Sequence, residues 1–213
     1  NAYRDYTQYA LDEVEKGDLD HWINRKSALA QIEINMDDLD HPSRSDWLSA
    51  VISPRPLALV STRNDGKENL APITSVSVVS NSPPLVVMSL SQSRDGKLRD
   101  TYNNLKDNGE CELQFLSASM EAAKDADLAG TATGESEWSL LESDGPIHPL
   151  AVVVMRCKLI EDNPLPEGAV ARLLVLRVES MVVPSHSPPK DGLSLLCQHG
   201  MDRLTPSPED WGY

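Results

Sequence analysis

The stretch NLAPITSVSVVSNSPPLVVMSL, residues 69–90, decides the fold class, because apolar and polar residues alternate along it. Alternation with a period of two is typical of a half-buried β-strand. The alternation slips at Val78 and Val79, which predicts a β-bulge, and residues 82–84 predict a turn before a second, more apolar strand. The small hydroxyl side chains of residues 74–82 leave the backbone accessible, as a flat polar ligand requires. A polar, solvent-facing sheet surface is the alternative interpretation.

Strand patterns continue on both sides of this stretch. Residues 57–63 and 67–73 flank Asn64-Asp65-Gly66-Lys67, and Asp-Gly between apolar runs is a strong hairpin signal. Further strands are predicted at 85–90, 110–117, 151–162 and 169–183, with short helices at 97–109 and 119–130. About six strands, joined mainly by hairpins, predict a mainly β fold, either an antiparallel barrel or a sandwich, with short flanking helices.

The two ends of the chain have a different character. Tyr6, Tyr9, Ala10 and Val14 have helical spacing before Gly17, which predicts one helix within an N-terminal extension of residues 1–45. The extension is expected to pack on the domain or on a partner chain, or to be a loosely docked arm. The domain itself is predicted at residues 46–205, and residues 206–213 are predicted to form an irregular C-terminal tail.

Composition excludes several classes of protein. The chain has 213 residues, enough for one domain with a terminal extension, and its formal charge is −14 (19 basic against 33 acidic residues). This charge disfavours nucleic acid and anionic membranes, and no apolar run approaches the length of a membrane helix. Three cysteines without a CxxC pair, together with no apolar leader, predict a reducing, cytoplasmic location. A removed leader is the open alternative.

Catalytic signatures are missing from the sequence. There is no GxSxG, no phosphate-binding GxxxxGK[ST], no GxGxxG after a strand and no HExxH. Cys197 and His199 would share one strand face, where packing is favoured over a metal site. No catalytic or metal-ligating side chain is predicted, so the chemistry is expected to come from a bound cofactor.

Several short motifs, in their order and spacing, resemble the flavin reductase-like family in its flavoredoxin-like branch. They cover residues 45–183 and comprise Pro54-Arg55-Pro56, Ser61-Thr62, Asp65-Gly66, Asn69-Leu70-Ala71-Pro72, Ser80 with Pro83-Pro84, Asp100-Thr101 and the run PLAVVVMRCKLIEDNPLP. The resemblance implies an FMN-binding split β-barrel, antiparallel, six-stranded and of Greek-key type.

The resemblance also implies which residues hold FMN. The ring and the ribityl chain would be held, largely through backbone groups, by Ile73, Thr74, Ser75, Val76, Ser77, Val78 and Ser80. The phosphate would lie near Ser89, Lys97, Arg99 and Thr101, where cations, a hydroxyl and a helix N-terminus favour an anion. Arg55 would be a second phosphate contact or a dimer contact. Alternatively, Lys97 and Arg99 are solvated charges of the helix, and Arg55 supports the first strand.

The activity implied by the resemblance is hydride transfer from NADH or NADPH to the flavin, with a homodimer as the assembly and an oxygenase or another electron acceptor as partner. The first alternative is an FMN-binding electron carrier without a nicotinamide site of its own. The second is a flavin-free interaction module, because Ile73, Ser75, Val76 and Ser77 stand where the family usually has aromatic residues and an asparagine.

Overall fold

The computed structural model describes residues 2–16, 32–92, 96–131, 136–143, 145–187 and 192–207. The chain divides into two compact units, residues 1–41 and 42–213. The first unit contains helix α1 (Ala2–Glu15), as predicted, and the short 3-10 helix η1 (Met36–Asp38), which the Asn35 side chain caps by accepting the Asp37 N–H. The 45/46 domain boundary stays a prediction.

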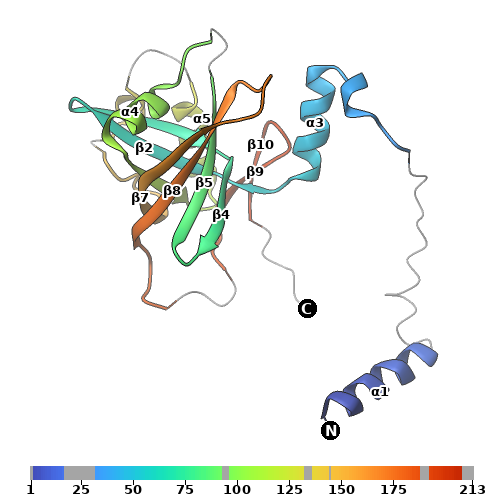
Figure 1. The fold of residues 1–213 in the computed structure, drawn as a ribbon. Helices are drawn as coiled ribbons and strands as arrows, with labels where there is room; N and C mark the ends of the chain where they lie inside the picture. Colours follow the sequence, from blue (N-terminus) through green and yellow to red (C-terminus); the bar gives the residue numbers. More distant parts are fainter. Residues whose placement is uncertain are drawn as a thin grey trace. The chain divides into compact units, whose positions relative to one another are not determined.

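A seven-stranded antiparallel sheet is the main element of the second unit (Figure 1). Its order is β3-β2-β6-β7-β8-β5-β4, so that β5 lies beside β8 although the two are distant in sequence. The strands are β2 (Ala58–Asn64), β3 (Lys67–Ile73), β4 (Val76–Asn81), β5 (Pro84–Ser91), β6 (Glu110–Leu116), β7 (Ala151–Pro164) and β8 (Ala171–Val182).

The predicted mainly β, antiparallel class is confirmed, but the six-strand count is wrong. The hydroxyl-rich segment forms its own strand, β4, which brings the larger sheet to seven strands. A second sheet has the order β1-β9-β10, from β1 (Arg55–Pro56), β9 (Leu196–His199) and β10 (Arg203–Pro206). These strands are too short to show a period of two in sequence. The larger sheet is not closed in the described chain, because β3 and β4 end the strand order without pairing with each other.

The predicted turn and bulge are both present. Asp65 and Gly66 have φ values of 48° and 75°, the left-handed conformations that a two-residue hairpin turn requires at both central positions. The β4–β5 register shifts between Val78 and Ser80, which confirms the bulge predicted at Val78 and Val79. The bulge bends β4 at the open end of the sheet.

The described residues of this unit also form helices α4 (Asp100–Asn108), α5 (Met120–Ala129) and α6 (Glu137–Leu140), and nearly all of α3 (His41–Val51), whose first residue belongs to the first unit. α4 ends at Gly109, whose φ of 74° is the left-handed conformation of a helix C-cap. The predicted placement of Leu98 on this helix is wrong, because Arg99 is the extended N-cap residue. Among the described residues, no helix is long and apolar enough to cross a lipid bilayer.

Helix α3 was not predicted, because its apolar and polar residues do not separate in the usual way. Ser49 is buried and donates from Oγ to the Met201 sulfur over 2.8 Å, beyond the end of β9. Trp47 and Val51 are exposed on α3. The small polar residue therefore makes the contact with the domain, contrary to the amphipathic rule.

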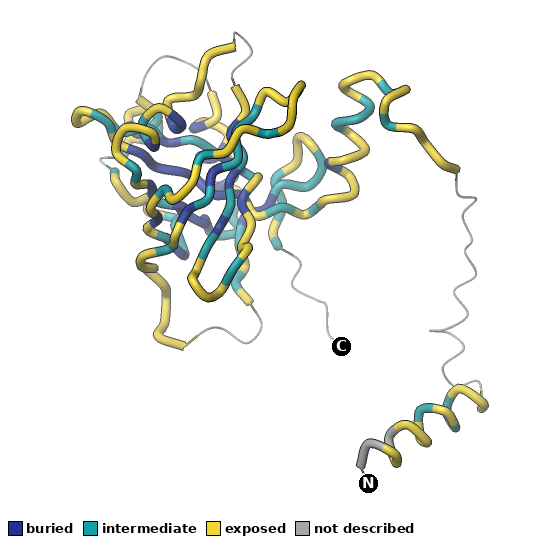
Figure 2. The backbone as a smooth tube through the Cα atoms, viewed as in Figure 1, coloured by how far each residue is buried: buried dark blue, intermediate teal, exposed yellow. Residues whose placement is uncertain are grey.

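Two clusters of buried side chains form the core, and Figure 2 shows the buried residues concentrated along the strands. The larger cluster joins Val60, Met88, Leu113 and Leu174 from four strands of the larger sheet. The smaller one packs residues of β2 and β3, such as Leu59, against α5 and α6. β2 is therefore buried on both faces, which explains its nearly unbroken apolar sequence.

Candidate functional site

The free edge of β4 presents backbone groups that no strand pairs with. β4 ends the strand order and pairs with β5 alone in the described part of the chain. The Ser89 N–H donates to the Ser75 carbonyl over 3.3 Å, and the register then runs without a shift to Val78, opposite Val86. Since bonded and non-bonded pairs alternate in an antiparallel ladder, the N–H and C=O groups of Val76 and Val78 point away from β5. They are available to a ligand.

The predicted serines Ser75 and Ser89 lie against each other next to this edge. Ser75 Oγ donates to the Ser89 carbonyl over 2.6 Å and accepts the Ser89 N–H over 3.3 Å. Ser77 is the next exposed residue beyond them on β4. Small hydroxyl side chains thus occupy the start of β4 on both sides of the buried Val76.

An apolar cavity of about 570 Å³ adjoins the edge. Val76, Ser77 and Val78 of β4 form one wall, and Phe115 of β6 and Met155 of β7 form part of another. Residues 183–187, after β8, and Leu193 and Leu195 also line it, together with Pro56, Val86, Val153 and Met181. Three residues predicted from sequence therefore meet side chains from distant strands that sequence analysis missed.

Arg55 contacts the predicted flavin segment through another residue. Its Nη2 donates to Gln198 Oε1 over 2.9 Å and to the Gly200 carbonyl over 2.8 Å. Thr74 Oγ1 donates to the same Gln198 oxygen over 3.0 Å. Gln198 on β9 thus joins the smaller sheet to the linker between β3 and β4. The sequence predicted no role for this glutamine.

The residues predicted at the phosphate lie near the end of β5 and the start of α4. Arg99 Nε donates to the Ser91 carbonyl over 3.1 Å, two residues from Ser89. Lys97 is exposed just before the helix. Thr101 is buried, and its Oγ1 accepts from Asn69 Nδ2 over 3.0 Å, so its hydroxyl is already engaged.

The two remaining predicted residues lie at the ends of the segment. Ile73 is buried at the end of β3, within the larger core cluster. Ser80 lies beyond the bulge, where its Oγ accepts the Ser82 N–H over 3.2 Å. Ser80 is therefore separated from Ser75 and Ser77 by the register shift.

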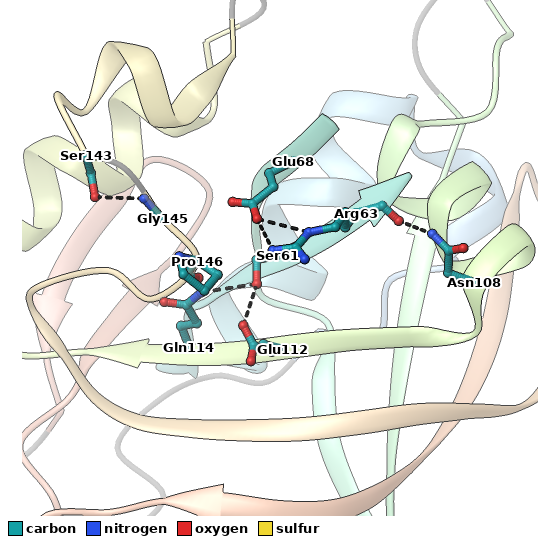
Figure 3. Close-up of polar contacts among 9 residues, drawn as sticks. All are labelled: Ser61, Arg63, Glu68, Asn108, Glu112, Gln114, Ser143, Gly145 and Pro146. Atoms are coloured by element: carbon teal, nitrogen blue, oxygen red, sulfur yellow. Dashed lines mark hydrogen bonds and ion pairs between the residues drawn. The ribbon is translucent and has the colours of Figure 1, made fainter. Parts of the chain in front are cut away.

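A buried polar network elsewhere brings Ser, His and Asp side chains into one region without forming a catalytic triad. Gln114 Nε2 donates to Ser61 Oγ over 3.2 Å, and Gln114 Oε1 accepts the His148 N–H over 2.7 Å (Figure 3 draws Gln114 with Ser61). His148 Nδ1 accepts the Leu150 N–H over 3.1 Å, so Nε2 carries the proton toward Asp125, 3.3 Å away. Burial lowers the pKa of His148, although Asp125 opposes this shift. Both ring nitrogens are occupied, so His148 cannot act as a base.

The cysteines show no metal site. Cys197 and His199 lie on β9, and no cluster of three or more potential metal ligands occurs among the residues described. Cys111 on β6 lies directly opposite Cys157 on β7. A hydrogen bond with Cys157, followed by burial, raises the pKa of Cys111 well above its usual value. This thiol therefore stays protonated and unreactive at neutral pH.

The described chain thus combines an open antiparallel sheet, a free backbone edge on β4 and an apolar cavity beside that edge. Residues 51–204 match the family model described as the flavin reductase like domain. This match covers well over half of the chain. The chain belongs to the flavin reductase-like family.

Two curated relatives match parts of the chain. The chain is 26% identical over 118 residues to an uncharacterized protein of Deinococcus radiodurans, covering 53% of this chain and 52% of that protein. It is 37% identical over 75 residues to the uncharacterized protein YwrF of Bacillus subtilis, covering 35% of this chain and 36% of YwrF. The matched segments thus span about half or less of these relatives.

The fold is similar to that of several solved structures. Nitrilotriacetate monooxygenase component B from Bacillus cereus has a TM-score of 0.73 at 21% identity, covering 87% of this chain and 100% of its own. The FMN-binding protein from Thermus thermophilus has a TM-score of 0.64 at 18% identity, and the alignment covers 88% of this chain and 99% of that protein. Flavoredoxin from Methanosarcina acetivorans has a TM-score of 0.64 at 18% identity, and the alignment covers 87% of this chain and 95% of that protein. At these identities the likeness establishes the fold.

Proposed function

We propose that the protein is an FMN-binding oxidoreductase of the flavin reductase type, which uses NADH or NADPH as hydride donor. The observation that carries this proposal is the free edge of β4, where the N–H groups of Val76 and Val78 point away from β5 beside an apolar cavity. When bound, FMN would supply a ring system that accepts two electrons from a nicotinamide and passes them on. The carbonyl oxygens and ring nitrogens of such a ring need donors, and its faces need apolar contact.

The predicted residues divide into three roles. Val76 and Val78 would donate backbone N–H groups to the ring, since their side chains line the cavity and cannot donate. Ser75 and Ser77 would leave room for the ribityl chain at the start of β4. Arg99, beside Ser91, would meet the phosphate as a cation at the N-terminus of α4.

Arg55 acts at a distance in this scheme. Its guanidinium orients Gln198, and Gln198 orients the Thr74 hydroxyl, so Arg55 would position the flavin segment without touching FMN. A homodimer belongs to the same proposal, because Val79 on β4 and Val182 at the end of β8 are exposed. β4 and β8 lie on either side of β5, and exposed apolar side chains on one sheet favour an interface.

The proposal is tested by absorbance spectra of the purified protein with added FMN, before and after anaerobic NADH or NADPH. Flavin bands that are retained through gel filtration and then bleach rapidly with the nucleotide would support the reductase. Bands that persist until dithionite is added would favour the electron carrier. If FMN is not retained at all, the cofactor assignment is wrong and the flavin-free module becomes the better interpretation.

Replacing Val78 with proline is expected to raise the dissociation constant for FMN about tenfold, which corresponds to one lost hydrogen bond of about 1.4 kcal/mol. Proline removes the N–H that points to the free edge, and edge positions of this kind tolerate proline without loss of the ladder. The melting temperature should therefore stay close to that of the wild type. Fluorescence titration of FMN measures the effect.

Val78→Ala is the matched control, because it shortens the side chain but keeps the N–H. Equal FMN affinity in the proline and alanine variants would show that the edge donor is not used. A large drop in melting temperature for Val78→Pro would instead place this N–H in the β4–β5 ladder, contrary to the register derived above.

A further inference from the structure

The apolar cavity beside β4 is large enough to hold a small molecule. Its volume of about 570 Å³ lies within the range of small-molecule sites. Val76 and Val78 belong both to the cavity wall and to the free edge, so a molecule in the cavity lies next to whatever the edge holds. The cavity is therefore placed to receive a second molecule, one that exchanges electrons with the first.

The lining of the cavity selects by charge. Among the described residues that form it there is no Asp, Glu, Lys or Arg, and its polar groups are confined to Ser77 and the 185–187 segment. The polar side chains among these residues are Ser77, Ser185, His186 and Ser187, which are few partners for an ion against a mainly apolar wall, so moving an ion from water into the cavity is unfavourable. The net charge of −14 adds a general repulsion of anions. Neither effect opposes the binding of an uncharged molecule.

The rim of the cavity is accessible and adaptable. Met181, at the end of β8, lines it and is 46% exposed, and Val78 on β4, which also lines it, is 60% exposed. Methionine side chains, with three rotatable bonds, adjust to ring systems of different shape. The open side of the sheet therefore provides an entrance lined by apolar atoms.

From these observations we infer that the cavity binds the electron acceptor of the reductase, and that this acceptor is an uncharged, largely apolar ring compound of the quinone type. The inference rests on the proposed function. The overall step is NAD(P)H + H⁺ + quinone → NAD(P)⁺ + hydroquinone. One nicotinamide C–H bond breaks, its two electrons reduce the quinone, and the hydride hydrogen and one solvent proton account for the two O–H bonds that form.

Binding is tested first, without FMN, by a pair of fluorescent probes that differ by one charge. N-phenyl-1-naphthylamine is neutral, and 1-anilinonaphthalene-8-sulfonate is the same ring system with a sulfonate. We expect the neutral probe to bind at least tenfold more tightly. Equal affinity for the two probes, or no binding of the neutral one because a second copy of the chain fills the cavity, overturns the inference.

Turnover is tested next with NAD(P)H, saturating FMN and two quinones. 1,4-Naphthoquinone is expected to have a kcat/KM at least about 100-fold above that of 1,4-naphthoquinone-2-sulfonate. Comparable values for the two quinones overturn the inference while leaving the reductase proposal intact. Failure of the protein to bind FMN overturns both.

Met181→Arg identifies the site, because it places a cation on the rim at a half-exposed position that tolerates it. The substitution should lower the affinity for the neutral probe at least tenfold and raise the affinity for the sulfonated probe. It should also reduce the ratio of the kcat/KM values of the two quinones. Met120→Arg is the matched control at a position on α5 that is 76% exposed and does not line the cavity. Identical probe affinities in the two variants overturn the assignment of the site.

Discussion

Replacing Gln114 with methionine is expected to lower the free energy of unfolding by about 3 kcal/mol. Gln114 on β6 is completely buried. Its Nε2 donates to the Pro146 carbonyl over 2.8 Å and its Oε1 accepts the His148 N–H over 2.7 Å. Methionine has a similar volume and preserves the packing, but it leaves both backbone groups buried without partners, at about 1–3 kcal/mol each. Urea denaturation at pH 7 measures the change.

Glu112→Gln is the control for this prediction. Glu112 contacts Ser61 and Arg156 nearer the surface, so its replacement should change stability by less than about 1 kcal/mol. If the Gln114→Met variant is as stable as the Glu112→Gln control, residues 145–148 are not anchored by Gln114. The network would then not hold this segment against β6 (Figure 3).

The features that the sequence predicted are those governed by neighbouring residues. The turn at Asp65-Gly66 needs two residues that accept positive φ, and these two do. The bulge at Val78 follows from a break in the alternation of polar and apolar residues. The C-cap at Gly109 follows from the freedom of glycine in the left-handed region. In each case the local chemistry and the tertiary structure agree.

The features that could not be predicted from the sequence depend on contacts between distant segments. The role of Gln198 depends on the pairing of β9 with β1, which brings its side-chain amide between Arg55 and Thr74. The cavity needs Phe115 and Met155 beside β4, and both look like ordinary core residues in sequence. β1, β9 and β10 contain too few residues for a period to show.

The second large effect is expected at Asp162, near the end of β7. Its carboxylate is 8% exposed and accepts from Tyr102 Oη over 2.7 Å, Arg172 Nε over 2.5 Å and Lys106 Nζ over 3.3 Å. Burial by itself would raise the pKa of Asp162, but hydrogen bonds from Arg172, Tyr102 and Lys106 outweigh it and lower this pKa. The cluster joins α4, whose N-cap residue is Arg99 of the predicted phosphate site, to the β7–β8 hairpin.

Replacing Asp162 with alanine is expected to lower the free energy of unfolding by about 2 kcal/mol at pH 7, because the Tyr102 hydroxyl loses its acceptor inside the protein. The folded-state pKa of Asp162 lies below the value of about 3.9 for the unfolded chain, so the stabilisation is present above that value and is lost as the pH falls through the folded pKa. Urea denaturation between pH 7 and pH 3 should therefore show the wild type and variant converging.

Glu179→Ala removes a comparable carboxylate from an exposed pair with Arg177 and should change stability by less than about 1 kcal/mol. A difference between Asp162→Ala and the wild type that stays constant down to pH 3 would mean that the Asp162 contacts do not depend on its charge. Asp162→Asn distinguishes the two contributions, because its amide oxygen still accepts from Tyr102 while its charge is gone. If charge dominates, Asp162→Asn should resemble Asp162→Ala at pH 7. If the neutral hydrogen bond dominates, it should resemble the wild type.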